Sequence, residues 1–126
     1  MAKALADIFQ GVFFIIAPLI GVLGAFMSGS CTVSNTLFGA LQFEAASLLS
    51  LPQVLIVALQ NCGGAIGNMI CVNNVVAACA TTGTFGQEGK IIRVNIVPCL
   101  IYSLIVAIVV GIMIYSGFNP MPELLN

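Results

Sequence analysis

Charged side chains are scarce in this chain, and histidine and tryptophan are absent from it. Charged residues make up 6% of the 126 residues, whereas hydrophobic residues make up 60%. A soluble domain has about a quarter of its residues charged, because water must solvate its surface. The composition therefore predicts an integral membrane protein. The few charges also exclude a basic surface of the kind that binds nucleic acid.

The sequence also lacks the patterns on which enzymes and metal sites are built. It has no histidine and no CxxC pair, so the usual spacing of zinc ligands is missing, and no nucleophile has an obvious base. The number of cysteines, 5, is odd. It does not suit a closed disulfide framework, and free cysteine packs as a small hydrophobe. We therefore expect no enzyme activity, no cofactor and no metal.

The clearest predicted element is a regular transmembrane helix over Asn95–Ser116. At about 1.5 Å per residue, this apolar run matches a hydrocarbon core about 30 Å thick. Pro98 falls in the predicted first turn, where a missing N–H does little harm, and Pro120 prevents the helix from continuing.

Residues Ile8–Leu49 are predicted to form a re-entrant helical hairpin. The first stretch, Ile8–Met27, contains Pro18 and several glycines, which weaken the helix but let another helix approach closely. The polar stretch Ser28–Asn35 follows. The next apolar stretch, Thr36–Leu49, gives only about 21 Å of helix, which is short for a crossing. We interpret Ser28–Asn35 as the hairpin tip, with two full crossings as the alternative.

A discontinuous transmembrane helix is predicted over Pro52–Thr82. Apolar character holds through Leu59, is interrupted at Gln60–Asn68 and resumes at Met69. Neither flank is expected to cross a bilayer alone, whereas the whole segment is long enough, which is typical of discontinuous helices in transporters. Unpaired backbone groups are costly in lipid, so the break is expected to be buried or to line a watery cavity.

The loop Gly83–Arg93 sets the predicted orientation. It holds Lys90 and Arg93, two of the three basic residues in the chain, so the positive-inside tendency places it in the cytoplasm. The hairpin then enters from the outer face. Residues 1–126 are thus predicted to form one all-α, multi-pass segment of the plasma membrane.

Both polar interruptions place hydroxyl, amide and glycine residues just before a half-helix. A helix N-terminus carries unpaired N–H groups and partial positive charge, so it can bind an anion without a basic side chain. Ser34 or Asn35 is the expected N-cap of the helix beginning near Thr36, and Asn68 that of the helix beginning near Met69. If the hairpin tip meets the break, both N-termini converge on one carboxylate. The candidate binding residues are Ser28, Ser30, Thr32, Ser34, Asn35, Thr36, Asn61, Gly63, Gly64 and Asn68.

Two further expectations concern the same polar residues. Small hydroxyl residues and glycines also hold membrane helices together, so a structural role for both clusters is the alternative. Proton coupling needs a titratable group, and Glu44 is the only carboxylate within a predicted membrane segment, where its charge is expensive. Glu44 is therefore the candidate proton-coupling residue, unless it reaches the outer interface.

Three stretches carry a family resemblance. They are GAFMSGSCTVSNTLFGALQ at Gly24–Gln42, GNMICVNNVVAACATTG at Gly67–Gly83 and the loop GQEGKIIR at Gly86–Arg93. In this order they resemble the carboxy-terminal portion of the L-lactate permease family. The order of helix, hairpin, broken helix and helix also resembles one half of the wider ion-transporter superfamily. There an SNT tripeptide at hairpin tips contacts carboxylate substrate and coupling ion, and Ser34-Asn35-Thr36 matches it.

The resemblance implies a plasma-membrane carrier that imports L-lactate, and often glycolate, together with protons, with sodium as the alternative coupling ion. Chains of the family are several-fold longer. We therefore expect this chain to be a fragment that needs the lipid bilayer and the remaining helices of a larger transporter, and to be inactive alone. Cys31 and Asn73 depart from the family pattern, which more often has Asn or Asp at the first position and His or another polar residue at the second. A polar contact is then missing at the tip.

A self-standing small membrane protein is the alternative function, either an oligomeric pore or a structural partner in a membrane complex. A pore is expected to present a polar stripe along a full-length helix. Polarity here is confined to the helix interruptions, which favours the carrier.

Overall fold

A computed structural model describes residue 8 and residues 11–120. Within this range the regular structure is entirely helical, which confirms the predicted all-α class. The helices are α2 (Phe13–Ser28), α3 (Cys31–Leu48), α4 (Gln53–Gly67), the short 3-10 helix η1 (Asn68–Ile70), α5 (Val72–Thr82) and α6 (Glu88–Tyr115).

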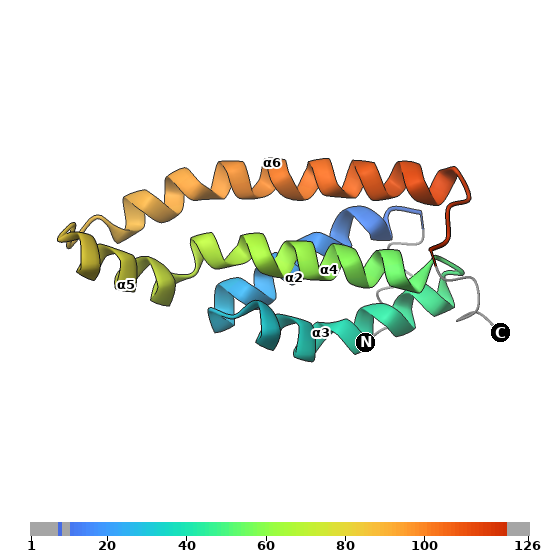
Figure 1. Cartoon of the computed structure of the whole chain (residues 1–126), viewed down its shortest axis with the longest axis horizontal. Helices are drawn as coiled ribbons and strands as arrows, with labels where there is room; N and C mark the ends of the chain where they lie inside the picture. The colour runs from blue at the N-terminus through green and yellow to red at the C-terminus, as the bar shows by residue number, and fades with distance from the viewer. Residues whose placement is uncertain (1–7, 9–10, 121–126) are drawn as a thin grey trace.

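The helices form an elongated antiparallel bundle around α4 (Figure 1). α2 and α3 make a helical hairpin, and α4 packs against both of its arms and against α6. After η1, α5 extends the line of α4 beyond the hairpin, and α6 returns along the whole length of the bundle (Figure 1). The hairpin turns beside the junction of α4 and α5, short of the connection between α5 and α6 (Figure 1).

Glycines bring the backbones of α2 and α4 into direct contact. A Cβ atom added to Gly63 would collide with the carbonyl oxygen of Pro18, and one added to Gly67 would lie 2.6 Å from the carbonyl oxygen of Val22. Gly21 meets the α4 backbone as closely from the other side. These contacts are closer than any side chain allows, which explains why small residues occur at the same heights on both helices.

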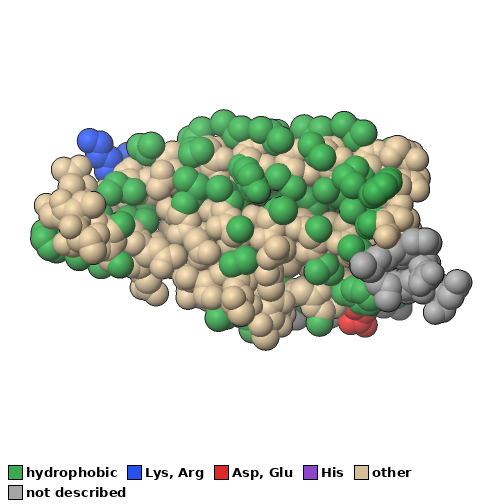
Figure 2. Space-filling model, viewed as in Figure 1, with side chains coloured by type: hydrophobic (Ala, Val, Ile, Leu, Met, Phe, Trp, Pro, Cys, Tyr) green, Lys and Arg blue, Asp and Glu red, His purple; other side chains and the backbone are tan. Residues whose placement is uncertain are grey.

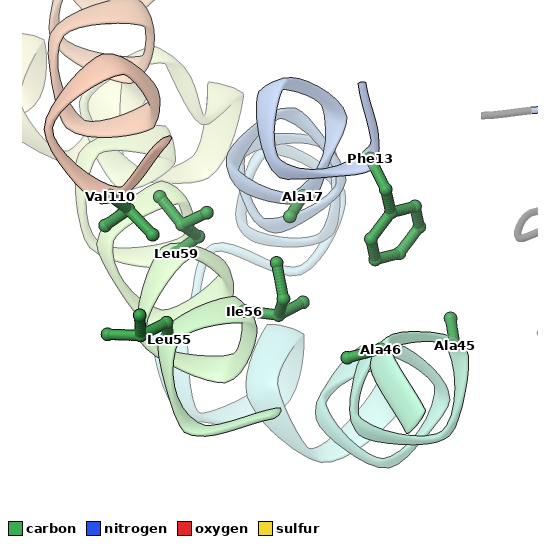
Figure 3. Packing of buried hydrophobic residues seen from close by; sticks show 8 residues of the cluster. All are labelled: Phe13, Ala17, Ala45, Ala46, Leu55, Ile56, Leu59 and Val110. Atoms are coloured by element: carbon green, nitrogen blue, oxygen red, sulfur yellow. The ribbon is translucent and has the colours of Figure 1, made fainter. Parts of the chain in front are cut away.

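An apolar core joins α2, α3, α4 and α6 at the end of the bundle away from the hairpin turn. Phe13 and Ile56 are fully buried at its centre, and Figure 3 shows them pointing toward one another from α2 and α4. Burying a side chain of this size stabilises the fold by about 1.5–3 kcal/mol. The cluster consists of Phe13, Ala17, Ala45, Ala46, Leu55, Ile56, Leu59 and Val110.

Within the described residues, two helices are long and apolar enough to cross a membrane, judged by length and composition: Gln53–Ile70, with 18 residues, and Glu88–Tyr115, with 28. The outward face of α6 exposes an apolar row that water would not favour. Its members are Leu100, Ile101, Leu104, Ile105, Ile108, Val109 and Ile112, each more than half exposed. Figure 2 shows hydrophobic side chains along this side and Lys and Arg at the end where α5 joins α6.

The boundaries of two predicted elements are corrected. α6 begins at Glu88 rather than Asn95, so Pro98 lies inside the helix and the charged residues of the predicted loop occupy its first turns. α2 begins at Phe13, and part of the stretch before it lies outside the described residues. Because an exposed helix start tolerates charge, hydropathy alone placed the beginning of α6 too late.

The position of the interruption in the discontinuous helix is also corrected. α4 continues through Gln60–Gly67, which the sequence indicated as the break, and the chain leaves the helix only at Asn68–Cys71. The glycines in that stretch are helical and closely packed, Gly63 and Gly67 against α2 and Gly64 against the start of α3. The helical segment before the break therefore reaches Ile70 and is long enough to cross a membrane. The sequence had predicted that neither flank of the break is long enough. Re-entry of the hairpin depends on where the membrane lies and stays a prediction.

Candidate functional site

The hairpin turn is held by its own small polar residues. Gly29 ends α2 with φ +72°, a conformation that favours glycine, and its N–H donates to Ala25 O at 2.8 Å. The Ser28 hydroxyl donates to Gly24 O at 2.7 Å. Ser30 is the N-cap of α3, and its Oγ accepts from Val33 N–H at 3.3 Å. α3 therefore begins at Cys31, which corrects the expected cap at Ser34 or Asn35.

The helix break is built from η1 and an extended residue. After Asn68–Ile70, Cys71 adopts φ −66° and ψ 130°, and α5 begins at Val72 without a side-chain cap. Asn68 is therefore not the N-cap that the sequence suggested. It lies one turn earlier, where its carbonyl accepts from Cys71 N–H at 3.3 Å.

Asparagine side chains bind two carbonyl groups at this break. Asn95 Nδ2, from α6, donates to Met69 O at 3.1 Å, and Asn74 Nδ2 lies 3.3 Å from Asn68 O. An unpaired buried carbonyl is costly, so these amides make the interruption tolerable in an apolar environment. A cleft of about 210 Å³ opens here between α5 and α6, and Asn68, Asn74 and Asn95 contribute to its lining.

The hairpin turn and the helix break lie against each other. Asn74 Nδ2 also donates to Gly29 O at 3.3 Å, and a Cβ on Gly29 would lie 3.2 Å from Cys71 Sγ. Gly29 is followed by Ser30, the N-cap of α3, and Cys71 directly precedes the start of α5. The N-terminal ends of the two helices are thus neighbours, each with first-turn N–H groups that lack partners within the helix.

A polar layer runs between α3 and α4 behind this meeting point. Ser34 is fully buried; its hydroxyl donates to Gly21 O at 2.9 Å and accepts from Gln60 Nε2 at 3.0 Å. Asn35 Nδ2 donates to Asn61 Oδ1 at 2.7 Å. The polar layer comprises Cys31, Ser34, Asn35, Gln42, Gln60 and Asn61.

Most of the predicted site residues come together, but their environments differ. The residues at or against the turn, the polar layer or the break are Ser28, Ser30, Ser34, Asn35, Asn61, Gly64 and Asn68, whereas Gly63 lies against α2. Thr32 and Thr36 lie on the exposed side of α3, where the Thr36 hydroxyl donates to Thr32 O at 2.9 Å. Glu44 is exposed about 20 Å along α3 from its start.

Two glycines of the predicted site have other roles than expected. Gly63 lies against the backbone of Pro18, so it serves helix packing. Gly64 is helical, and a Cβ there would lie 3.2 Å from Cys31 Sγ and 3.5 Å from Asn35 Oδ1. Its lack of a side chain lets the start of α3 approach α4.

Sequence reasoning did not place Gln42, Gln60 or Asn74 among the site residues. Both glutamines are fully buried within apolar helices, and Asn74 joins the turn to the break. A polar side chain inside an otherwise apolar membrane segment is the signal that could have identified the glutamines. The described residues contain no group of three or more metal-ligating side chains.

The described part of the chain is all-helical, has two apolar helices long enough to cross a membrane, and brings two polar interruptions against each other, an arrangement that recurs in membrane transport proteins. The model of the family "L-lactate permease" matches residues 1–116. The chain belongs to the L-lactate permease family, whose members are transporters and not enzymes.

Curated relatives agree with this assignment. The chain is 40% identical to a putative L-lactate permease of Haemophilus influenzae over 108 residues, 86% of this chain and 20% of that protein. It is 35% identical to the glycolate permease GlcA of Escherichia coli K12, over 91% of this chain and 21% of that protein. The L-lactate permease of the same strain is 37% identical, over 82% of this chain and 19% of that protein. The chain spans about a fifth of the length of these relatives. No solved structure matches it.

Proposed function

We propose that this chain is part of a secondary transporter that carries L-lactate or a similar small 2-hydroxy monocarboxylate across the plasma membrane, coupled to protons. The observation that carries the proposal is the contact between the hairpin turn and the helix break, through Asn74 and Gly29. It brings the N-terminal ends of α3 and α5 to one place, where a carboxylate would meet two sets of N–H groups.

Backbone dipoles, rather than basic side chains, would attract a carboxylate to the hairpin turn. The basic residues in the described range are Lys90 and Arg93, both exposed in the first turns of α6, and α6 meets the helix break through Asn95. At the hairpin turn itself, a carboxylate would meet N–H groups and amides of this segment. Such donors are effective in a site that excludes water, because few solvent dipoles compete with them.

The names of the relatives support the substrate class. Lactate and glycolate, the substrates named for the relatives, share a carboxylate beside a hydroxyl-bearing carbon. We infer that the chain corresponds to the carboxy-terminal part of such a carrier, needs its remaining helices and is inactive alone. The hairpin and α4–α5 would move against that scaffold to give alternating access. Family membership favours this carrier over a self-standing pore or structural partner.

A chimaera tests the proposal: this chain replaces the matching segment of the Haemophilus influenzae relative, and a cysteine-free version of the chimaera is used for thiol labelling. Vesicles with the chimaera are expected to take up L-lactate. A cysteine at Thr32, exposed at the start of α3, is expected to react more slowly with a thiol reagent when lactate or glycolate is present. Thr81→Cys is the control, an equally exposed threonine near the end of α5. Uptake without protection at position 32 would place the substrate elsewhere.

Glu44 remains our candidate for the coupling proton, although it lies away from the hairpin turn. Glu44→Gln keeps the size of the side chain and removes its carboxyl group. We expect this variant of the chimaera to exchange internal for external lactate at a normal rate but to lose accumulation driven by an inward proton gradient. Retained accumulation would assign proton coupling to a group outside this chain.

A further inference from the structure

The buried end of the polar layer has a fixed donor and acceptor order. Gln42 Nε2 donates to Ala17 O at 2.9 Å, and both groups are fully buried. A backbone carbonyl can only accept, so the nitrogen of the Gln42 amide must face α2.

This orientation leaves a buried acceptor unused. Gln42 Oε1 has no hydrogen-bond partner among the described residues. Turning the amide over would not help, because Oε1 would then face the carbonyl oxygen of Ala17. An unfilled buried acceptor is unfavourable in a native fold and calls for a reason. The reason we find is that Gln42, held in this orientation, sets the direction of the hydrogen bonds that its neighbours make.

Gln60 transmits that order from α3 to α4 and back. Gln42 Nε2 donates to Gln60 Oε1 at 2.5 Å, so the Gln60 nitrogen faces the other way. There Nε2 donates to Ser34 Oγ at 3.0 Å and lies 3.3 Å from Ser34 O, a second group that can only accept. The backbone carbonyls of Ala17 and Ser34 thus fix the orientation of both glutamine amides.

The order continues to the exposed end of the layer. Gln60 Nε2 reaches Asn35 Oδ1 at 3.4 Å, and Asn35 Nδ2 donates to Asn61 Oδ1 at 2.7 Å. The Cys31 thiol lies 3.4 Å from the same oxygen. Asn61 Oδ1 is therefore occupied. The Asn61 Nδ2 group, on an exposed residue, has no partner within the described part of the chain.

We propose that Gln42 and Gln60 are positioning residues that fix the polarity of the Asn35–Asn61 amide pair, so that Asn61 offers N–H donors rather than a carbonyl oxygen beside the hairpin turn. This inference rests on the proposed function and names how the site selects an anion. A carboxylate oxygen can accept from Asn61 Nδ2. If the amide pair turned over, Asn61 would present an oxygen that repels the carboxylate.

The first test compares two buried glutamines of α4 in the chimaera. Gln60→Leu removes the group that orders Asn35. Gln53→Leu places the same side chain at a buried glutamine about two turns earlier in the same helix. We expect Gln60→Leu to raise the KM for L-lactate about tenfold to hundredfold, with little change in maximal rate or membrane level. Gln53→Leu is expected to leave KM unchanged. Equal KM values for both variants would overturn the proposal.

Asn61→Asp tests the polarity itself. The aspartate keeps an oxygen that accepts from Asn35 Nδ2 but loses the donor and adds negative charge. We expect folding to be retained and saturable lactate uptake to be lost. An unchanged KM would show that Asn61 does not face the substrate, which also overturns the proposal.

Side-chain amide exchange in the 126-residue chain, measured by NMR in micelles, separates this inference from the proposed function. The Gln60 amide protons should exchange slowly and those of Asn61 fast, and Gln60→Leu should accelerate exchange at Asn35. If the Gln60 amide protons exchange slowly but the chimaera does not transport, the fixed polarity is supported and only the proposed carrier function is contradicted. Fast exchange at Gln60 would overturn the fixed polarity whatever the chimaera does.

Discussion

Gly63→Ala is expected to separate α2 from α4 and to abolish both the folded hairpin and uptake by the chimaera. The new methyl group would collide with the carbonyl oxygen of Pro18 and lie 2.7 Å and 2.8 Å from its carbonyl carbon and Cα. These atoms are backbone, so they cannot swing aside as the end of a side chain could. We expect a loss well above the 1–3 kcal/mol, roughly, that an extra core methylene costs.

Gly39→Ala is the matched control, because it makes the same change in a helix with open space around it. Nothing lies within 4 Å of a Cβ at Gly39. Alanine is favoured over glycine inside a helix by about 1 kcal/mol, so this variant should be neutral or slightly more stable. Both variants are compared by their level in the membrane, their resistance to protease and their lactate uptake. A Gly63→Ala chimaera with normal values in all three assays would refute the close contact between α2 and α4.

The sequence predicted those features that depend on local pattern. The all-α class, the apolar helix that became α6 and the presence of a polar turn after Met27 follow from hydropathy and from small polar residues. The same pattern misplaced the break. Gln60–Asn68 has the composition of an interruption, yet its glycines stay helical, packed against α2 and α3. Packing between helices decided the outcome, and one sequence does not reveal which helices pack together.

The helix caps show a similar limit. Ser30 and Ser34 are equally good N-cap residues by type. Ser34 lies within reach of Gly21 O and Gln60, so its hydroxyl serves contacts between helices and Ser30 caps α3 instead. The fixed amide order was beyond sequence reasoning for the same reason. Gln42 and Gln60 are 18 residues apart, and their contact exists only once α3 and α4 are side by side.

Gly64 connects the fold to the candidate site. The sequence placed it within the predicted break, whereas it is helical and is not among the glycines with positive φ. What its missing side chain allows is contact with the start of α3: a Cβ would lie 3.2 Å from Cys31 Sγ, 3.5 Å from Asn35 Oδ1 and 3.6 Å from Ser34 Oγ. Alanine at this position needs a shift of a few tenths of an ångström, but valine adds two methyl groups among these polar atoms.

Gly64→Val is therefore expected to reduce lactate uptake by the chimaera to background while the protein still reaches the membrane. The branched side chain would push the start of α3 away from α4, break the hydrogen bond between Asn35 and Asn61, and separate the hairpin turn from the helix break. Gly64→Ala should keep measurable uptake with a raised KM, because the Cys31 thiol can yield. Ala65→Val is the control, since it places the same β-branched residue on the neighbouring, exposed position of α4. Uptake and membrane level are measured for all three variants. Near-normal uptake by a well-expressed Gly64→Val chimaera would show that the contact between α3 and α4 at this height serves packing alone, and that lactate binds elsewhere.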